Sequence, residues 1–138
     1  DKNNFAIHWY GKTDGTGRLL GATQVAAPAP KLFISSATWQ INDSTGKVFD
    51  DDWSQSGCIE RSASNRADVY RNGVSVSNLT ANSTNMPNIN LHLLNSNNDG
   101  TPNTPTAAKM SRFAFTVKMT SQQHLDWVAN EAAFLAML

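Results

Sequence analysis

The dipeptide Asn72-Gly73 restricts how this chain can fold more than any other feature of the sequence. Asn and Gly adopt positive φ angles more readily than other residues, and two such angles in succession make the type I′ turn of a two-residue β-hairpin. The arms on either side are β-prone, and valines alternate with serines from Val74 to Ser77. Residues 67–77 therefore predict a tight antiparallel hairpin whose second arm is half-buried.

Further strands are predicted where apolar residues alternate with polar ones, or form short runs between turn residues. A helix is predicted to follow the last of them. Thr120 and Gln123 have the spacing of a capping box at a helix start, and four apolar residues then repeat at helical intervals. We expect strands at 5–10, 18–20, 32–34, 38–41, 88–94 and 109–117, and a helix over 121–137 with Leu125, Val128, Ala132 and Leu135 on its buried face.

Charge and hydropathy exclude several classes of partner. The formal net charge is +0, and Lys and Arg are scattered singly, so no electrostatic footprint for nucleic acid or an anionic membrane is present. No apolar run approaches the ~20 residues that a membrane span needs. Only 16% of the residues are charged, and Asn, Ser and Thr are abundant. This composition is typical of β-rich extracellular or virion-surface proteins.

Two polar loops offer candidate binding residues. Asp52 and Trp53 end an acidic cluster that is interpreted either as a solvated loop or as a Ca²⁺ site beside a sugar-stacking ring. Residues 95–100 repeat Asx at alternate positions before a Gly, as in the opening of an EF-hand loop, but Thr106 replaces the acid that such a loop needs. A turn is therefore the preferred interpretation. The candidate carbohydrate-binding residues are Trp53, Asp52, Asn97 and Asp99.

Candidate catalytic and metal-ligating residues are weak. Cys58 is the single cysteine, and it is interpreted as a small buried residue because no His lies near it in the sequence to activate a nucleophile. His8 is interpreted as a hydrogen-bonded residue on a sheet face, with a ligand role as the alternative, because no second ligand lies at metal spacing. His124 falls in the first turn of the helix and is expected at the surface. We therefore expect no catalytic residue, no metal site and no cofactor.

From Cys58 to the end, the order of elements resembles the C-terminal half of a laminin-G-like, concanavalin A-type jelly roll, in the variant found in phage virion and bacterial surface proteins. The resemblance is carried by Asp68–Val74, by Asn88–Leu91 with Asn95–Gly100, and by Phe113–Phe115 leading into Met119–Gln123. It implies an all-β fold, an antiparallel two-sheet jelly-roll sandwich with one C-terminal α-helix, as a single domain over residues 1–138. The metal ligands of the lectins and the paired catalytic carboxylates of the glucanase relatives are not recognisable.

Three functions are considered, of which an enzyme is the least favoured because no catalytic group of residues is recognisable. The first is a non-enzymatic structural or decoration protein of a phage virion or other extracellular assembly; the alternative is a lectin-like carbohydrate-binding module. Trp127 and Phe134 lie about 20° apart on the helical wheel, at ~100° per residue, and we expect this edge to contact another copy or another protein of the assembly. The expected location is the virion surface or the extracellular space. The expected partners are further copies, other virion proteins or, in the alternative, surface glycans.

Overall fold

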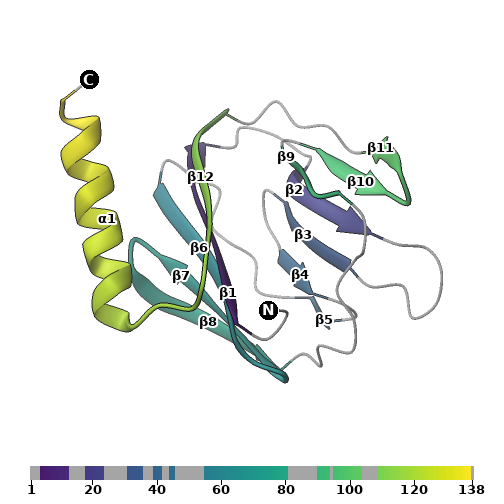
Figure 1. Cartoon of the computed structure of the whole chain (residues 1–138), viewed down its shortest axis with the longest axis horizontal. Coiled ribbons are helices and arrows are strands. Elements are labelled where there is room, and N and C mark those ends of the chain that lie inside the picture. Colours follow the sequence, from purple (N-terminus) through teal and green to yellow (C-terminus); the bar gives the residue numbers. More distant parts are fainter. Residues whose placement is uncertain are drawn as a thin grey trace.

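The computed structural model describes residues 4–12, 18–23, 31–35, 39–41, 44–45, 55–80, 90–93, 95–103 and 109–137. They form two β-sheets and a helix, α1 (Ser121–Leu135), which lies against the outer face of the larger sheet (Figure 1). No helix in this described part is long and apolar enough to cross a membrane. Asp52 and Trp53 lie outside the described residues.

We call the sheet with the longer strands the larger sheet, although in the described part of the chain it has five strands and the other has seven. It is entirely antiparallel. Its strand order is β12-β1-β6-β7-β8. The first and last described strands of the chain, β1 and β12, are therefore neighbours in this sheet. Its strands are β1 (Phe5–Lys12), β6 (Gln55–Ala63), β7 (Arg66–Arg71), β8 (Val74–Thr80) and β12 (Lys109–Thr116).

The smaller sheet has the order β11-β10-β2-β3-β4-β5, with β9 also paired to β2. All its pairs are antiparallel except β10 with β2, which is parallel. The molecule is therefore an all-β two-sheet jelly-roll sandwich with a C-terminal helix, as predicted. The strands are β2 (Arg18–Thr23), β3 (Lys31–Ser35), β4 (Trp39–Ile41), β5 (Ser44–Thr45), β9 (His92–Leu93), β10 (Ser96–Asn98) and β11 (Thr101–Asn103).

The structure confirms the predicted turn and differs from the sequence expectations at other places. Asn72 and Gly73 both have positive φ angles, 50° and 78°, as a type I′ turn requires. The second arm is not half-buried, because β8 is the edge strand of its sheet and Val74 is 58% exposed. Residues 101–103 and 55–63, neither of which was predicted as a strand, form β11 and β6.

The inner face of the larger sheet is apolar. Ile7 pairs with Ile59 and Ile59 with Val69 across three strands, and all three side chains are fully buried. The buried ring of Trp9 covers Gly57 on the next strand, and a Cβ built on Gly57 would overlap its indole atoms. A glycine is therefore required at this position so that the large ring fits.

We expect Gly57→Ala to lower the free energy of unfolding by about 1–3 kcal/mol, the usual cost of overpacking a core. Urea denaturation followed by far-ultraviolet circular dichroism measures this. The control is the double variant with Trp9→Leu, in which the methyl group finds room. The cost of the double variant should be smaller than the sum of the two single costs. Additive costs would show that the indole does not set the requirement.

Candidate functional site

The outer face of the larger sheet, which α1 covers, is polar. Register places His8 opposite Cys58 and Cys58 opposite Tyr70, so these three side chains form a row across β1, β6 and β7. Glu60 lies two residues further along β6 and therefore points to the same side. A sheet face that packs on a helix is usually apolar. The polar layer between this sheet and α1 therefore calls for a specific explanation.

The helix begins where the sequence predicts. The Thr120 hydroxyl accepts a hydrogen bond from the backbone N–H of Gln123, and the Gln123 side chain accepts one from the N–H of Thr120. This capping box is confirmed. The predicted buried stripe is wrong, however, because the buried residues of the helix are His124 and Glu131, while Leu125 is 45% exposed.

Glu60 sets the rotation of the helix. Its Oε2 lies 3.0 Å from Nε2 of His124 and accepts a 2.6 Å hydrogen bond from the backbone N–H of Met119. The Tyr70 ring stacks on the His124 ring with the centroids 3.7 Å apart. His124 is therefore buried beneath the helix start, and the prediction of a surface position was wrong. Its acid partner lies 64 residues away in the sequence, where no local pattern reveals it.

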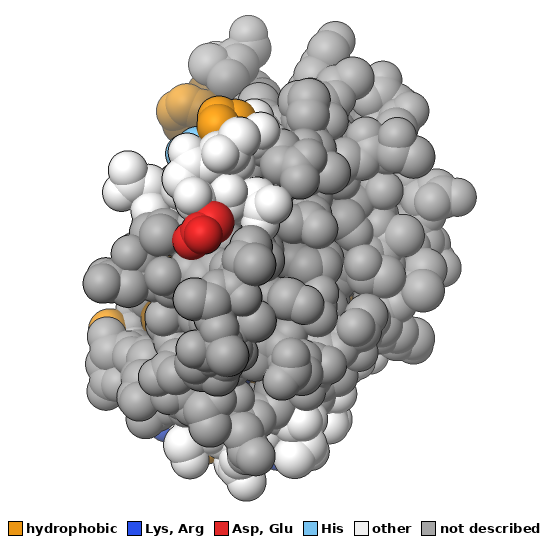
Figure 2. Space-filling view, turned by 90° about the vertical axis from the view of Figure 1, so that its right-hand side faces the viewer, with side chains coloured by type: hydrophobic (Ala, Val, Ile, Leu, Met, Phe, Trp, Pro, Cys, Tyr) orange, Lys and Arg blue, Asp and Glu red, His pale blue; other side chains and the backbone are white. Residues whose placement is uncertain are grey.

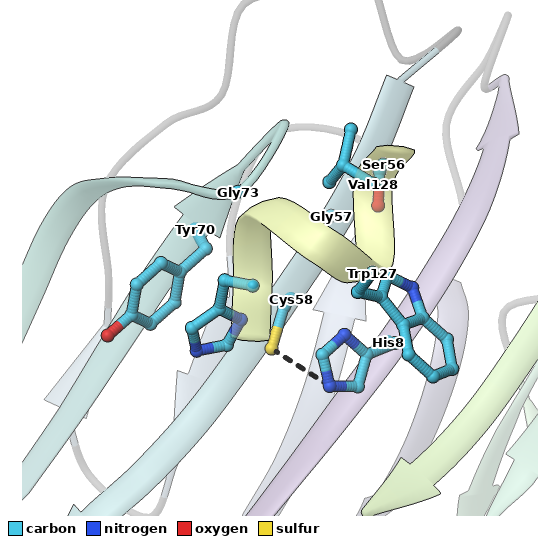
Figure 3. A pocket seen from close by; sticks show the side chains of 9 residues that line it. His8, Ser56, Gly57, Cys58, Tyr70, Gly73, Trp127 and Val128 are labelled. Carbon is cyan, nitrogen blue, oxygen red and sulfur yellow. Dashed lines mark hydrogen bonds between the residues drawn. The ribbon is translucent and has the colours of Figure 1, made fainter. Parts of the chain in front are cut away.

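His8 and Cys58 adjoin this pair. The Cys58 sulfur lies 3.8 Å from Nε2 of His8 (Figure 3). The same nitrogen lies 3.2 Å from the Thr116 hydroxyl. Burial, and then the neighbouring His124, lower the pKa of His8 to about 4, so its ring is neutral at pH 7. Burial also raises the pKa of the Cys58 thiol well above its usual value. A protonated, buried thiol is a poor nucleophile.

The interpretation of Cys58 as a small buried residue is confirmed. That of His8 as a hydrogen-bonded residue on a sheet face is also confirmed, although the fold adds what the sequence lacks. The Cys58 sulfur and one nitrogen each of His8 and His124 all lie within 4.8 Å of one another. Among the described residues, these are the ones that bring metal-ligating atoms together.

A cavity of about 220 Å³ lies beside this cluster, between α1 and the sheet. Glu131 on its wall is only 3% exposed, and neither oxygen of its carboxyl group has a hydrogen-bond partner in the described structure. A buried polar group without a partner costs about 1–3 kcal/mol, so a carboxylate in this position needs a reason. The cavity is lined by Tyr10, Ser56, Asn72, Val128, Glu131, Ala132 and Leu135.

Of the predicted carbohydrate-binding residues, Asn97 and Asp99 lie in the β10–β11 hairpin. The Asn97 side chain donates to the backbone carbonyl of Asn90 and accepts from the N–H of Gly100, each at 2.7 Å. Asn97 is therefore buried and holds the turn. Asp99 is exposed at the tip of that turn. Figure 2 shows the side of the molecule away from α1, where the described atoms are mostly uncharged around one acidic group.

The two predicted interface aromatics have different surroundings. The Trp127 ring packs on His8 within the chain, with the ring centroids 4.5 Å apart. Phe134 is 45% exposed, and the Arg112 guanidinium lies 4.1 Å from its ring centroid. Trp127 therefore completes the contact between helix and sheet. Phe134 is the exposed member of the pair, and its contact with another copy stays a prediction.

Comparison with known proteins identifies the fold but not a family. No family model matches the sequence, and no curated protein matches it. A solved structure of the CBM40 domain of the Ruminococcus gnavus IT-sialidase is similar to this chain, with a TM-score of 0.65 and 12% sequence identity. The match covers 91% of this chain and 83% of the CBM40 chain. The same domain bound to α2,3-sialyllactose matches over the same shares, with a TM-score of 0.56 and 11% identity. The chain is thus similar in fold to a carbohydrate-binding module, and the predicted jelly-roll resemblance holds at that coarse level.

Proposed function

We propose that this chain is a non-catalytic carbohydrate-binding module. The observation that carries the proposal is the partnerless carboxyl group of Glu131 on the wall of a 220 Å³ cavity. This volume corresponds to roughly seven water molecules at about 30 Å³ each, which is the scale of one sugar ring. The fold similarity to a carbohydrate-binding module, one copy of which holds sialyllactose, supports the same function.

The wall of the cavity suits the groups that a sugar presents. A carboxylate accepts hydrogen bonds from hydroxyl or ammonium groups, and the hydroxyl of Ser56 and the amide of Asn72 lie on the same wall. Val128 and Leu135 supply an apolar side for the C–H face of a ring. Glu131 would repel the carboxylate of a sialic acid. We therefore infer an uncharged sugar or an amino sugar as the ligand.

We propose that the module is non-catalytic because two reactive side chains of the polar layer, Cys58 and Glu60, are not available for catalysis. Cys58 carries a raised pKa and is buried, so its thiol is not activated. Glu60 is committed to His124 and to the N–H of Met119. Neither residue is free to act as a nucleophile or a general base.

A role in a virion or another assembly, the first function predicted from the sequence, finds no support in the comparisons. Exposed apolar side chains are the observation that favours it as a second candidate, with Val74, Leu125 and Phe134 each more than two-fifths exposed. If this surface is an interface, light scattering after size-exclusion chromatography will find a multimer, and Phe134→Ser will yield monomers. A wild-type monomer at micromolar concentration excludes that role.

A glycan array followed by calorimetry tests the carbohydrate-binding proposal. We expect the wild-type chain to bind neutral or amino-sugar glycans and to release no reducing sugar from them. Sialylated versions of the same glycans should bind no better than their unsialylated forms. No binding across the panel, or sugar release that depends on one carboxylate, contradicts the proposal.

A further inference from the structure

We propose that His8, Cys58 and His124 form a binding site for one zinc-like divalent cation between α1 and the larger sheet. Their donor atoms come from β1, β6 and the first turn of α1, and lie within 4.8 Å of one another. Figure 3 shows the Cys58 sulfur directed at His8, with Trp127 beside the imidazole. This site is separate from the Glu131 cavity and does not depend on the proposed glycan binding.

The distances are close to those of a coordinated ion. Zinc binds nitrogen at about 2.0–2.1 Å and sulfur at about 2.3 Å, so two nitrogens and one sulfur in tetrahedral positions lie roughly 3.3–3.6 Å apart. The sulfur of Cys58 and Nε2 of His8 are 3.8 Å apart, close to this range. The other separations are at most 4.8 Å, so the largest must shrink by about 1–1.5 Å when an ion binds.

There is also space at this point. A cavity of about 10 Å³ is lined by all three residues, and by Ser56, Tyr70 and Trp127 among others. This is close to the roughly 10–15 Å³ that one water molecule needs. The cavity therefore offers space on the scale of a single ion, and three protein ligands leave a fourth coordination position open.

The donor set selects the class of metal. Two imidazoles and one thiolate favour zinc and other borderline or soft cations over Mg²⁺ and Ca²⁺, which prefer oxygen. Each imidazole ligates through the lone pair of its neutral form. Cys58 must give up its proton: the S–H bond breaks, the sulfur–metal bond forms, and one proton is released to solvent for each ion bound.

Glu60 would support the site by a hydrogen bond to His124 without binding the metal itself. When Nε2–H of His124 donates to Oε2 of Glu60, the lone pair of the neutral ring is on Nδ1 and is available to the metal. A carboxylate behind a ligating histidine is the usual support of such sites, because it fixes the tautomer and the ring orientation. The ion would join three segments that are far apart in the sequence and would fix α1 to the sheet.

Titration of the chelator-treated protein with Co²⁺, followed by Zn²⁺, tests the site. To allow for slow entry to a buried site, the metal is also added during refolding. We expect one Co²⁺ per chain, with the near-ultraviolet charge-transfer band of a thiolate ligand, loss of that band on adding one equivalent of Zn²⁺, and a higher melting temperature with zinc. Cys58→Ser and His8→Gln should each weaken binding at least tenfold.

His92 provides the matched control. It is the third histidine of the chain and lies outside the cluster, so His92→Gln should leave the affinity and the cobalt spectrum unchanged. The proposal is overturned if the wild type binds no metal or shows no thiolate band, or if Cys58→Ser binds as tightly as the wild type. Should a variant fail to fold, the spectrum of the wild type alone still decides.

Discussion

Replacing Glu131 with leucine is expected to abolish glycan binding and, at the same time, to raise the free energy of unfolding by about 1–3 kcal/mol. The carboxyl group is buried and has no hydrogen-bond partner among the protein groups of the described structure, so no bond within the protein offsets the cost of burying it. Leucine removes that cost at a similar side-chain volume. It also removes the group that would accept hydrogen bonds from the sugar. Urea denaturation measures the first effect, and calorimetry with the best glycan of the array measures the second.

Gain of stability with loss of binding distinguishes a functional residue from a structural one. Asp126 is the control on the same helix, because it is exposed and bonds only to the neighbouring Gln122 side chain among the described contacts. Asp126→Asn should change both quantities little. A loss of stability in Glu131→Leu would mean that the carboxyl group supports the fold. Unchanged glycan binding would place the sugar elsewhere, with the exposed Asp99 turn as the next candidate.

The parts of the fold that could be predicted from the sequence depend on contacts within a few residues. The Asn72-Gly73 turn and the Thr120–Gln123 capping box are each complete within four positions of the chain, so their residue types alone specify them. The β6 strand could not be recognised in this way. One of its faces is polar, with Ser56, Cys58 and Glu60, and Gly57 interrupts the other. Its strand conformation is imposed by its neighbours β1 and β7.

The polar layer could not be predicted because its pairs are distant in the sequence. Cys58 meets His8 across 50 residues, and His124 meets Glu60 across 64. The apolar stripe of α1 was misleading for the same reason. Since the sheet face beneath the helix is polar, His124 and Glu131 turn inward and Leu125 turns toward solvent. A histidine and a glutamate seven residues apart lie on the same face of a helix. This spacing is the sequence feature that could have indicated a polar buried face.

Replacing Glu60 with leucine is expected to lower the free energy of unfolding by about 2–4 kcal/mol, at about 1–3 kcal/mol for the buried donor left unpaired and about 1 kcal/mol for the half-buried one. These donors are Nε2 of His124 and the backbone N–H of Met119, both bonded to Oε2 of Glu60. The helix start is held by these two bonds and by the Tyr70 stack. Amide hydrogen exchange should therefore accelerate first in residues 121–135, and thermal denaturation should report the total loss.

Glu60→Gln is the matched control, because both hydrogen bonds end on Oε2 and an amide carbonyl oxygen, which has two lone pairs, can take its place at nearly the same side-chain volume. It should cost less than half as much as the leucine variant. If leucine and glutamine cost the same, the volume of the side chain matters and its acceptor oxygens do not. If leucine costs nothing, the helix is held by the packing of Trp127 on His8, and the Glu60–His124 pair exists for another purpose, of which supporting a metal-ligating imidazole is the one its geometry favours.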